Sequence, residues 1–155
     1  MKGIENRLVY LFSGEFFAVV AFTLVYFYQF SSYHSYSLMY TLFVLNFILL
    51  QGSFFWVIKW RRMRERRTIL PNLNKFFLAL KKINLVLICI GPFIVIIDKI
   101  VDHSSFFILW LALIIYVFTI IEYINYFHIQ LTNYKDGKGK KSTIAKDIER
   151  MTKKL

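Results

Sequence analysis

Two glutamates lie within long apolar stretches of the chain, where an ionisable group is costly and is a functional candidate by default. These are Glu15 and Glu122. With a rise of about 1.5 Å per residue in a helix, Glu15 and Gln51 each lie about 10 Å inside the nearer boundary of their stretches. Glu122 lies slightly closer to its boundary, with Asn125 beneath it. The depths predict one intramembrane polar layer of four side chains, which Asn84 could approach from below.

Two interpretations of this layer remain open. Two carboxylates close together in a medium of low dielectric constant cannot both stay ionised cheaply, so the layer would bind a proton, a cation or a cationic solute. Alternatively, the carboxyl and amide groups hydrogen-bond between helices and determine their packing. In that case Arg7, Lys59 or Lys82 could reach in and pair with the carboxylates.

A second group of polar residues lies near the other end of the apolar stretches. It consists of Asp98, Asp102 and His103, with His34 in a separate loop. A divalent metal would explain why carboxylates lie at the C-terminal end of a helix, where the helix dipole disfavours them. Lys99 and exposure to water explain the same fact, and the spacing of a metal site is absent. We therefore predict neither a metal nor a cofactor.

Signatures of enzymes are missing from the sequence. Glu122, Asn125 and His128 do not reproduce the Glu-x-x-His motif of di-iron bundles. Gly139-Lys140 does not belong to a phosphate-binding loop, because Tyr134 stands where the first glycine is required and Lys141 where Ser or Thr is required. A single cysteine, Cys89, excludes an intrachain disulfide. We predict no catalytic residues and a protein that is not an enzyme.

Four long apolar stretches must position these side chains. They cover residues 8–30, 38–58, 83–101 and 106–127, and each has about the 20 residues needed to cross a hydrocarbon core. The chain is 57% hydrophobic with a net charge of +11, a combination that fits apolar helices in lipid and charges outside it. We expect the first stretch to be retained, since Glu15 interrupts it and no small-x-small cleavage site follows. The predicted fold is all-α, a polytopic integral membrane protein with a four-helix transmembrane domain at 1–134 and a basic cytoplasmic tail at 135–155.

The basic residues are sorted by position along the chain. Of the 20 Lys and Arg residues, two precede the first stretch, nine lie between the second and third, eight follow the fourth, and only Lys99 falls on the other side. The positive-inside rule therefore predicts that both termini and the central loop are cytoplasmic. We expect the membrane to be the plasma (inner) membrane of a bacterial-type cell. Aromatic residues expected near the inner interface are Tyr10, Trp56, Trp60, Tyr123 and Tyr126.

A polybasic segment follows the second stretch. It contains Arg61, Arg62, Arg64, Arg66 and Arg67, and the tail adds Lys140 and Lys141. Such a segment attracts anionic lipid headgroups by about 1 kcal/mol per charge near the surface. It could instead contact a protein partner or act only as a topology signal, and we do not expect it to bind nucleic acid.

Two further helices are predicted outside the hydrocarbon. Residues 72–82 are an interfacial helix before the third crossing, or a simple extension of that crossing. Residues 135–141 are expected to be flexible. Beyond them Ile144, Ile148, Met151 and Leu155 form an apolar stripe on a short helix, which needs the membrane or a protein partner to cover it, or else is a solvated tail.

The predicted function is that of a small non-catalytic membrane protein, an interaction, accessory or immunity-type subunit with a basic cytoplasmic surface. Its partners would be the lipid bilayer and its anionic headgroups, a protein, or further copies of the chain. The alternative is an oligomeric transporter or channel for a small solute, a proton or a cation that uses Glu15 and Glu122.

Overall fold

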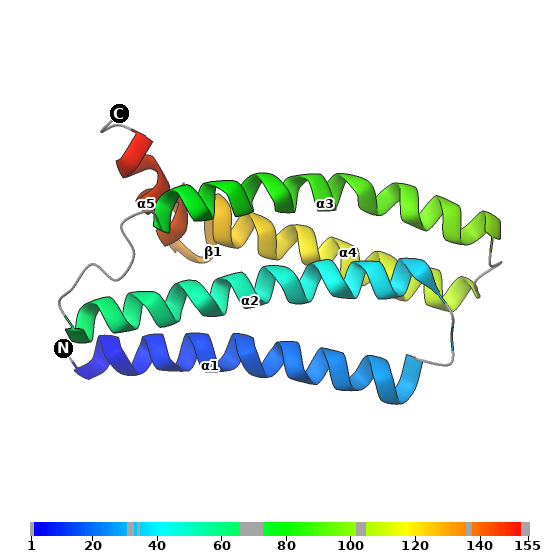
Figure 1. Ribbon diagram of the computed structural model, residues 1–155, viewed down its shortest axis with the longest axis horizontal. Helices are drawn as coiled ribbons and strands as arrows, with labels where there is room; N and C mark the ends of the chain where they lie inside the picture. Colours follow the sequence, from blue (N-terminus) through cyan, green and yellow to red (C-terminus); the bar gives the residue numbers. More distant parts are fainter. Residues whose placement is uncertain are drawn as a thin grey trace.

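A computed structural model describes residues 2–30, 33, 35–65, 73–101, 105–135 and 138–152. It is a bundle of four long helices with a small hairpin and a short helix at one end (Figure 1). The long helices are α1 (Lys2–Val25), α2 (Tyr36–Glu65), α3 (Leu73–Val101) and α4 (Phe106–Phe127). A π-helical turn, η1 (Tyr26–Phe30), extends α1. The short elements are β1 (Ile129–Lys135), β2 (Lys138–Lys141) and α5 (Thr143–Thr152).

The described part of the chain confirms four helices that are long and apolar enough to cross a membrane. Their most apolar parts have mean hydropathies between 1.9 and 2.3. We call the end of the bundle where α1 and α3 begin and α2 and α4 end the basic end; the hairpin and α5 lie there too (Figure 1). A helix satisfies its own backbone hydrogen bonds, which is why these apolar segments can be placed in lipid.

The second helix is the centre of the bundle. Of the residues in the most apolar part of α2, 61% are buried inside the protein, compared with 6% of those in the most apolar part of α1. The helix has its main contacts with α1 and α4 and also packs against α3. Its side chains Leu45 and Ile48 belong to the main core, together with Phe77 of α3 and Phe127 of α4. Most apolar side chains of α1 therefore remain on the outside, as lipid-facing side chains would.

A proline inside α3 is accommodated by a tyrosine of α4. Pro92 has no backbone N–H, so the carbonyl of Ile88, one turn earlier, lacks its usual helical donor. The hydroxyl of Tyr116 donates to this carbonyl at 2.9 Å. Gly91 leaves room for the ring, because a Cβ there would lie 2.5 Å from Cε2 of Tyr116. A neighbouring helix thus satisfies the backbone group that the proline frees.

The beginning of α3 is a simple extension of the third long helix, which was the second of the two alternatives given by the sequence. The described helix runs without a break from Leu73 to Val101, so residues 73–82 extend the third long helix. Residue 72 lies outside the described residues.

Residue 135 and residues 138–141, which we expected to be flexible, belong to a hairpin in the structure. Strands β1 and β2 pair in an antiparallel hairpin, with Ile129 opposite Lys141 and Lys135 opposite Lys138. The lysine-rich composition is typical of a solvated linker. A hairpin, however, is held by hydrogen bonds between backbone groups, which lysine residues can form as well as others. Asp136-Gly137, between the two strands in sequence, is a dipeptide typical of hairpin turns and was the signal for one. The predicted boundary after residue 134 falls inside this hairpin.

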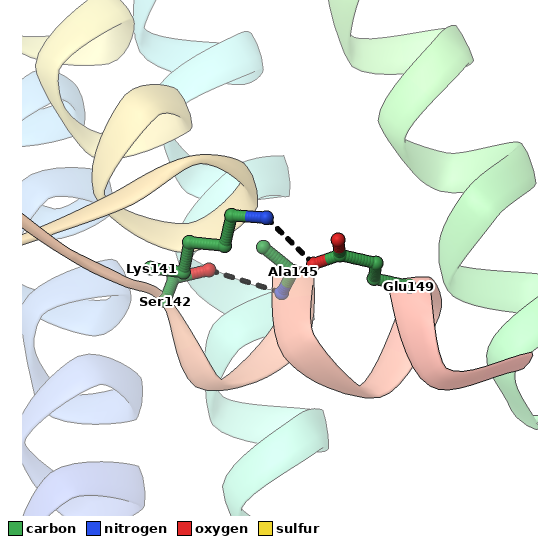
Figure 2. A network of polar contacts seen from close by, with 4 residues as sticks. All are labelled: Lys141, Ser142, Ala145 and Glu149. Carbon is green, nitrogen blue, oxygen red and sulfur yellow. Dashed lines mark hydrogen bonds and ion pairs between the residues drawn. The ribbon is translucent and has the colours of Figure 1, made fainter. Parts of the chain in front are cut away.

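Helix α5 packs against the bundle itself. Ile144 is 2% exposed and belongs to the main core, and α5 contacts α3 and α4. Figure 2 shows how the helix begins: the Oγ of Ser142 accepts a hydrogen bond from the backbone N–H of Ala145 at 3.0 Å. One residue earlier, Lys141 pairs with Glu149 at 2.7 Å. The surface that covers Ile144 is therefore the protein's own, while the side chains of the other three stripe residues lie outside the described residues.

Candidate functional site

The predicted polar side chains are distributed over separate contacts. On the α3 side of α2, Gln51 and Asn84 form a reciprocal amide pair. The Nε2 of Gln51 donates to Oδ1 of Asn84 at 3.0 Å, and the Nδ2 of Asn84 donates to Oε1 of Gln51 at 2.6 Å. Both side chains are buried. Two matched amides hold α2 and α3 together and leave Gln51 apart from the carboxylates.

Glu15 lies on the other side of α2, where α1, α2 and α4 meet. The Nε1 of Trp56 donates to Oε1 of Glu15 at 3.0 Å, and the hydroxyl of Tyr126 is a further hydrogen-bond partner of the carboxyl group. Gly52 makes this approach possible. A Cβ at that position would lie 2.6 Å from Oε2 of Glu15 and 2.6 Å from Cζ of Tyr126. A Trp and a Tyr thus hold one carboxylate of α1 in a fixed position.

The second carboxylate belongs to the same region. The Nδ2 of Asn125 donates to Oε2 of Glu122 at 3.4 Å. The carboxyl groups of Glu122 and Glu15 are near enough to interact electrostatically. The structure therefore brings together Glu15, Glu122 and Asn125 of the four predicted residues, and turns Gln51 toward α3.

A cavity of about 130 Å³ opens beside Glu15 at the basic end. Side chains from α1, α2 and α4 and the first residues of α5 line it: Leu11, Glu15, Trp56, Asn125, Tyr126 and residues 142–144. The Oε2 atom of Glu15 is buried against Gly52 and does not open onto the cavity.

Sequence reasoning missed most of the residues that line this cavity. It assigned Trp56 and Tyr126 to the inner membrane interface as aromatic residues, and it treated residues 142–144 as part of a separate tail. The depth of a residue follows from the helix rise, but the direction in which its helix faces does not. Gly52, next to Gln51, was the available signal, because small residues mark close approach of membrane helices.

Exposed basic side chains mark the end of α2. Arg61, Arg62 and Arg64 are exposed there, and the guanidinium of Arg64 lies 5.5 Å from the ring centroid of Trp60. Lys141 is also exposed at this end. Arg66 and Arg67 and the side chain of Lys140 lie outside the described residues. The described residues of the predicted basic surface therefore lie at the same end of the bundle as the cavity.

Asp98, predicted in a polar group at the opposite end, has a structural role. It is 0% exposed and accepts hydrogen bonds from the hydroxyl of Ser35 at 2.8 Å, the backbone N–H of Tyr36 at 3.0 Å, and the hydroxyl of Ser37. Its charge thus meets the first amides of α2, where the helix dipole favours an anion.

The rest of that polar group lies outside the described residues: Asp102, His103 and His34. Among the residues that are described, no group of three or more His, Cys, Asp or Glu side chains could hold a metal. The negative charge of Asp98 is stabilised by the start of α2, so it does not require a metal ion to stabilise it.

A further polar contact joins α1 to α2 near the middle of the bundle. The Nδ2 of Asn46 donates to the hydroxyl of Thr23 at 3.1 Å, and that hydroxyl donates to the carbonyl of Val19 at 2.8 Å. Hydrogen bonds of this kind fix the packing of membrane helices.

No protein-family model, no curated protein and no solved structure matches this chain. Its function must therefore be argued from the geometry of the basic end and of the cavity beside Glu15.

Proposed function

We propose that this chain is a non-catalytic integral membrane protein that acts through its basic end as an interaction, accessory or immunity-type subunit. It crosses the plasma (inner) membrane of a bacterial-type cell four times, with both termini in the cytoplasm. The observation that carries the proposal is the gathering of exposed arginines, Arg61, Arg62 and Arg64, where α2 leaves the apolar part of the bundle.

The charge distribution supports this orientation and the kind of partner. Nineteen of the 20 Lys and Arg residues belong to segments that lead to the basic end, and the positive-inside rule places such an end in the cytoplasm. There the inner leaflet offers anionic headgroups, which attract each basic side chain by about 1 kcal/mol. An acidic protein surface or a second copy of the chain would use the same charges.

The test compares the lipids and proteins that stay bound to the unaltered protein and to two variants after mild detergent extraction. In the charge-removed variant, Arg61, Arg62 and Arg64 are each replaced by Gln. We expect this variant to retain less anionic lipid, measured by mass spectrometry of the extracted lipids, or to lose a co-purifying protein. Lys99→Gln is the matched control, because Lys99 is exposed at the opposite end of the bundle. Equal retention of lipid and protein by all three forms would contradict the proposal.

A second candidate function is supported by the cavity and the two carboxylates. An oligomeric transporter or channel for a proton, a cation or a small solute would use Glu15 and Glu122, whose charges interact. Flux into proteoliposomes is the measurement, and Glu15→Gln and Glu122→Gln should each abolish it. Glu5→Gln, on the same helix as Glu15 but outside the cavity, is the control. Absence of flux for protons, alkali cations and lipophilic cations would remove this candidate.

A further inference from the structure

Two basic side chains meet where α3 and α4 reach the basic end of the bundle. Lys81 comes two residues before the third apolar stretch, and His128 directly follows the last residue of α4. The two helices are neighbours in the bundle (Figure 1). Both side chains therefore lie at the edge of the apolar part of the protein, which is the depth at which lipid headgroups begin.

A tyrosine of α4 holds this pair in place. Tyr123 is buried, and its hydroxyl donates to the backbone carbonyl of Lys81 at 3.5 Å. The centroid of its ring lies 5.5 Å from that of the His128 ring. One side chain thus contacts both basic residues and ties α3 to the end of α4. We call Lys81, Tyr123 and His128 the α3–α4 corner.

No carboxylate of the described residues neutralises the positive charge of the α3–α4 corner. The ammonium group of Lys81 is near enough to the imidazole of His128 to interact electrostatically. Neither residue has an ion pair in the part of the chain that the structure describes. His128 is exposed and Lys81 is partly exposed, so a ligand can reach both. A phosphate, with its negative charge and several acceptor oxygens, suits such a pair of donors.

The surroundings of the corner favour a lipid over a free anion. Leu85, one turn after Lys81 on α3, is 50% exposed, and Ile121, two turns before His128 on α4, is 42% exposed. Side chains one turn apart share a helix face, so apolar surface continues from Lys81 into the hydrocarbon. Basic pockets between membrane helices bind anionic headgroups at this depth. A zwitterionic headgroup would bring its own ammonium group toward Lys81, which repels it.

We propose that the α3–α4 corner binds the phosphate of one anionic phospholipid, such as phosphatidylglycerol, whose acyl chains lie along α3 and α4. Lys81 pairs with the phosphate, and the imidazole of His128 donates a hydrogen bond to it. The site goes beyond the proposed function, because it uses none of the arginines of α2 that carry that proposal.

An NMR titration of the full chain in micelles of a non-ionic detergent tests the inference. The probe is dihexanoyl phosphatidylglycerol, and the readout is the imidazole resonance of His128, assigned with the variant His128→Gln. We expect a saturable shift of this resonance. The titration midpoint of His128 should also rise from its lipid-free value, because a bound phosphate favours the imidazolium.

Two further ligands separate the lipid from its parts. Dihexanoyl phosphatidylcholine has the same chains but a zwitterionic headgroup, and glycerol 3-phosphate has a phosphate but no acyl chains. Each should bind to the unaltered protein at least about fivefold more weakly than dihexanoyl phosphatidylglycerol.

Matched variants separate the corner from the general charge of the basic end. Lys81→Gln should weaken the binding of phosphatidylglycerol about fivefold, the effect of one basic side chain near a headgroup. Lys75→Gln removes an exposed lysine of the same helix that lies farther from the hydrocarbon. This control and the charge-removed variant of α2 should keep the affinity at physiological ionic strength, which screens distant charges. The corner and the proposed function can therefore fail separately.

Three results would overturn the proposal. The first is no saturable response of His128 to phosphatidylglycerol, and the second is equally tight binding of phosphatidylcholine or glycerol 3-phosphate. The third is equal weakening by Lys81→Gln and either control variant, because only the net charge of the basic end would then matter. The comparison of the three ligands uses the unaltered protein, so it does not depend on the folding of any variant.

Discussion

Replacing Asp98 by alanine should uncouple the end of α3 from the start of α2. In the folded protein its carboxylate accepts hydrogen bonds from two serine hydroxyls, those of Ser35 and Ser37, and from the backbone N–H of Tyr36. The side chain of Asp98 is fully buried, with 0% of its surface exposed. The substitution leaves three donors without their acceptor at the place where α2 begins.

The size of the effect follows from the number of donors. A hydrogen bond to a charged group contributes about 1.5–3 kcal/mol, so three would suggest a loss above 4 kcal/mol. Part is recovered, because the two hydroxyls lie 3.1 Å apart and can bond to each other. Hydrogen bonds in membrane proteins are also often weaker than this. We therefore expect Asp98→Ala to lower the free energy of unfolding by about 3 kcal/mol, and Asp98→Asn, which keeps one oxygen, by roughly half as much.

Reversible unfolding in mixed detergent micelles titrated with dodecyl sulfate measures this quantity. Lys99→Ala is the matched control, since its side chain is exposed and such a substitution should change the free energy of unfolding by less than about 0.5 kcal/mol. A chelator should not destabilise the unaltered protein. Equal stabilities for Asp98→Ala and Lys99→Ala would refute the role assigned to Asp98, and a large effect of the chelator would favour a metal at this end.

Three further predictions concern the basic half of the bundle and its end. In a double-mutant cycle, Gln51→Leu and Asn84→Leu should each destabilise the protein and the double variant should recover part of the loss, with a coupling energy of about 1–2 kcal/mol; additive losses would contradict the amide pair. Gly52→Ala should lower the thermal stability, because its Cβ would lie 2.6 Å from a carboxylate oxygen, whereas Gly14→Ala, with nothing within 4 Å, should not; equal effects would contradict the close contact. Partial burial, and then the charge of Lys81, lower the pKa of His128 below its usual 6.5. Folding therefore favours the neutral imidazole, and the stability that His128 contributes is lost as the pH falls below 6.5. An NMR titration midpoint above 6.5 would contradict this.

The helices could be predicted from the sequence because apolar length is a local property. The stretch at 106–127 has the same bounds as α4, and the stretch at 8–30 ends where η1 ends. An apolar run of this length forms a helix because its backbone has no other partner in lipid.

The partners of the polar residues could not be predicted, because they depend on how each helix is rotated about its axis. Gln51 and Glu15 lie at the same predicted depth, yet one faces Asn84 of α3 and the other faces Trp56 and Tyr126. Rotation is set by the packing of many side chains from several helices. Depth alone therefore combined residues that have different partners into one layer.

The packing of Ile144 against the bundle could not be predicted for a related reason. The burial of Ile144 depends on a hairpin that returns the chain to the bundle, and on the contact between the hydroxyl of Ser142 and the carbonyl of Tyr126. Neither is visible in the composition of a lysine-rich segment. The cavity could not be predicted either, because residues 142–144 form part of its wall.

The central claim is that both chain ends and the basic end lie on one side of a membrane that the chain crosses four times. It is tested most directly by cysteine labelling in a Cys89→Ser background with a maleimide that cannot cross membranes. Tyr33→Cys places a thiol at an exposed position between α1 and α2, and Lys141→Cys places one at the basic end. On intact cells we predict labelling at position 33 only, and in sealed inverted vesicles at position 141 only. Labelling of both positions from the same face would contradict the four crossings and the orientation.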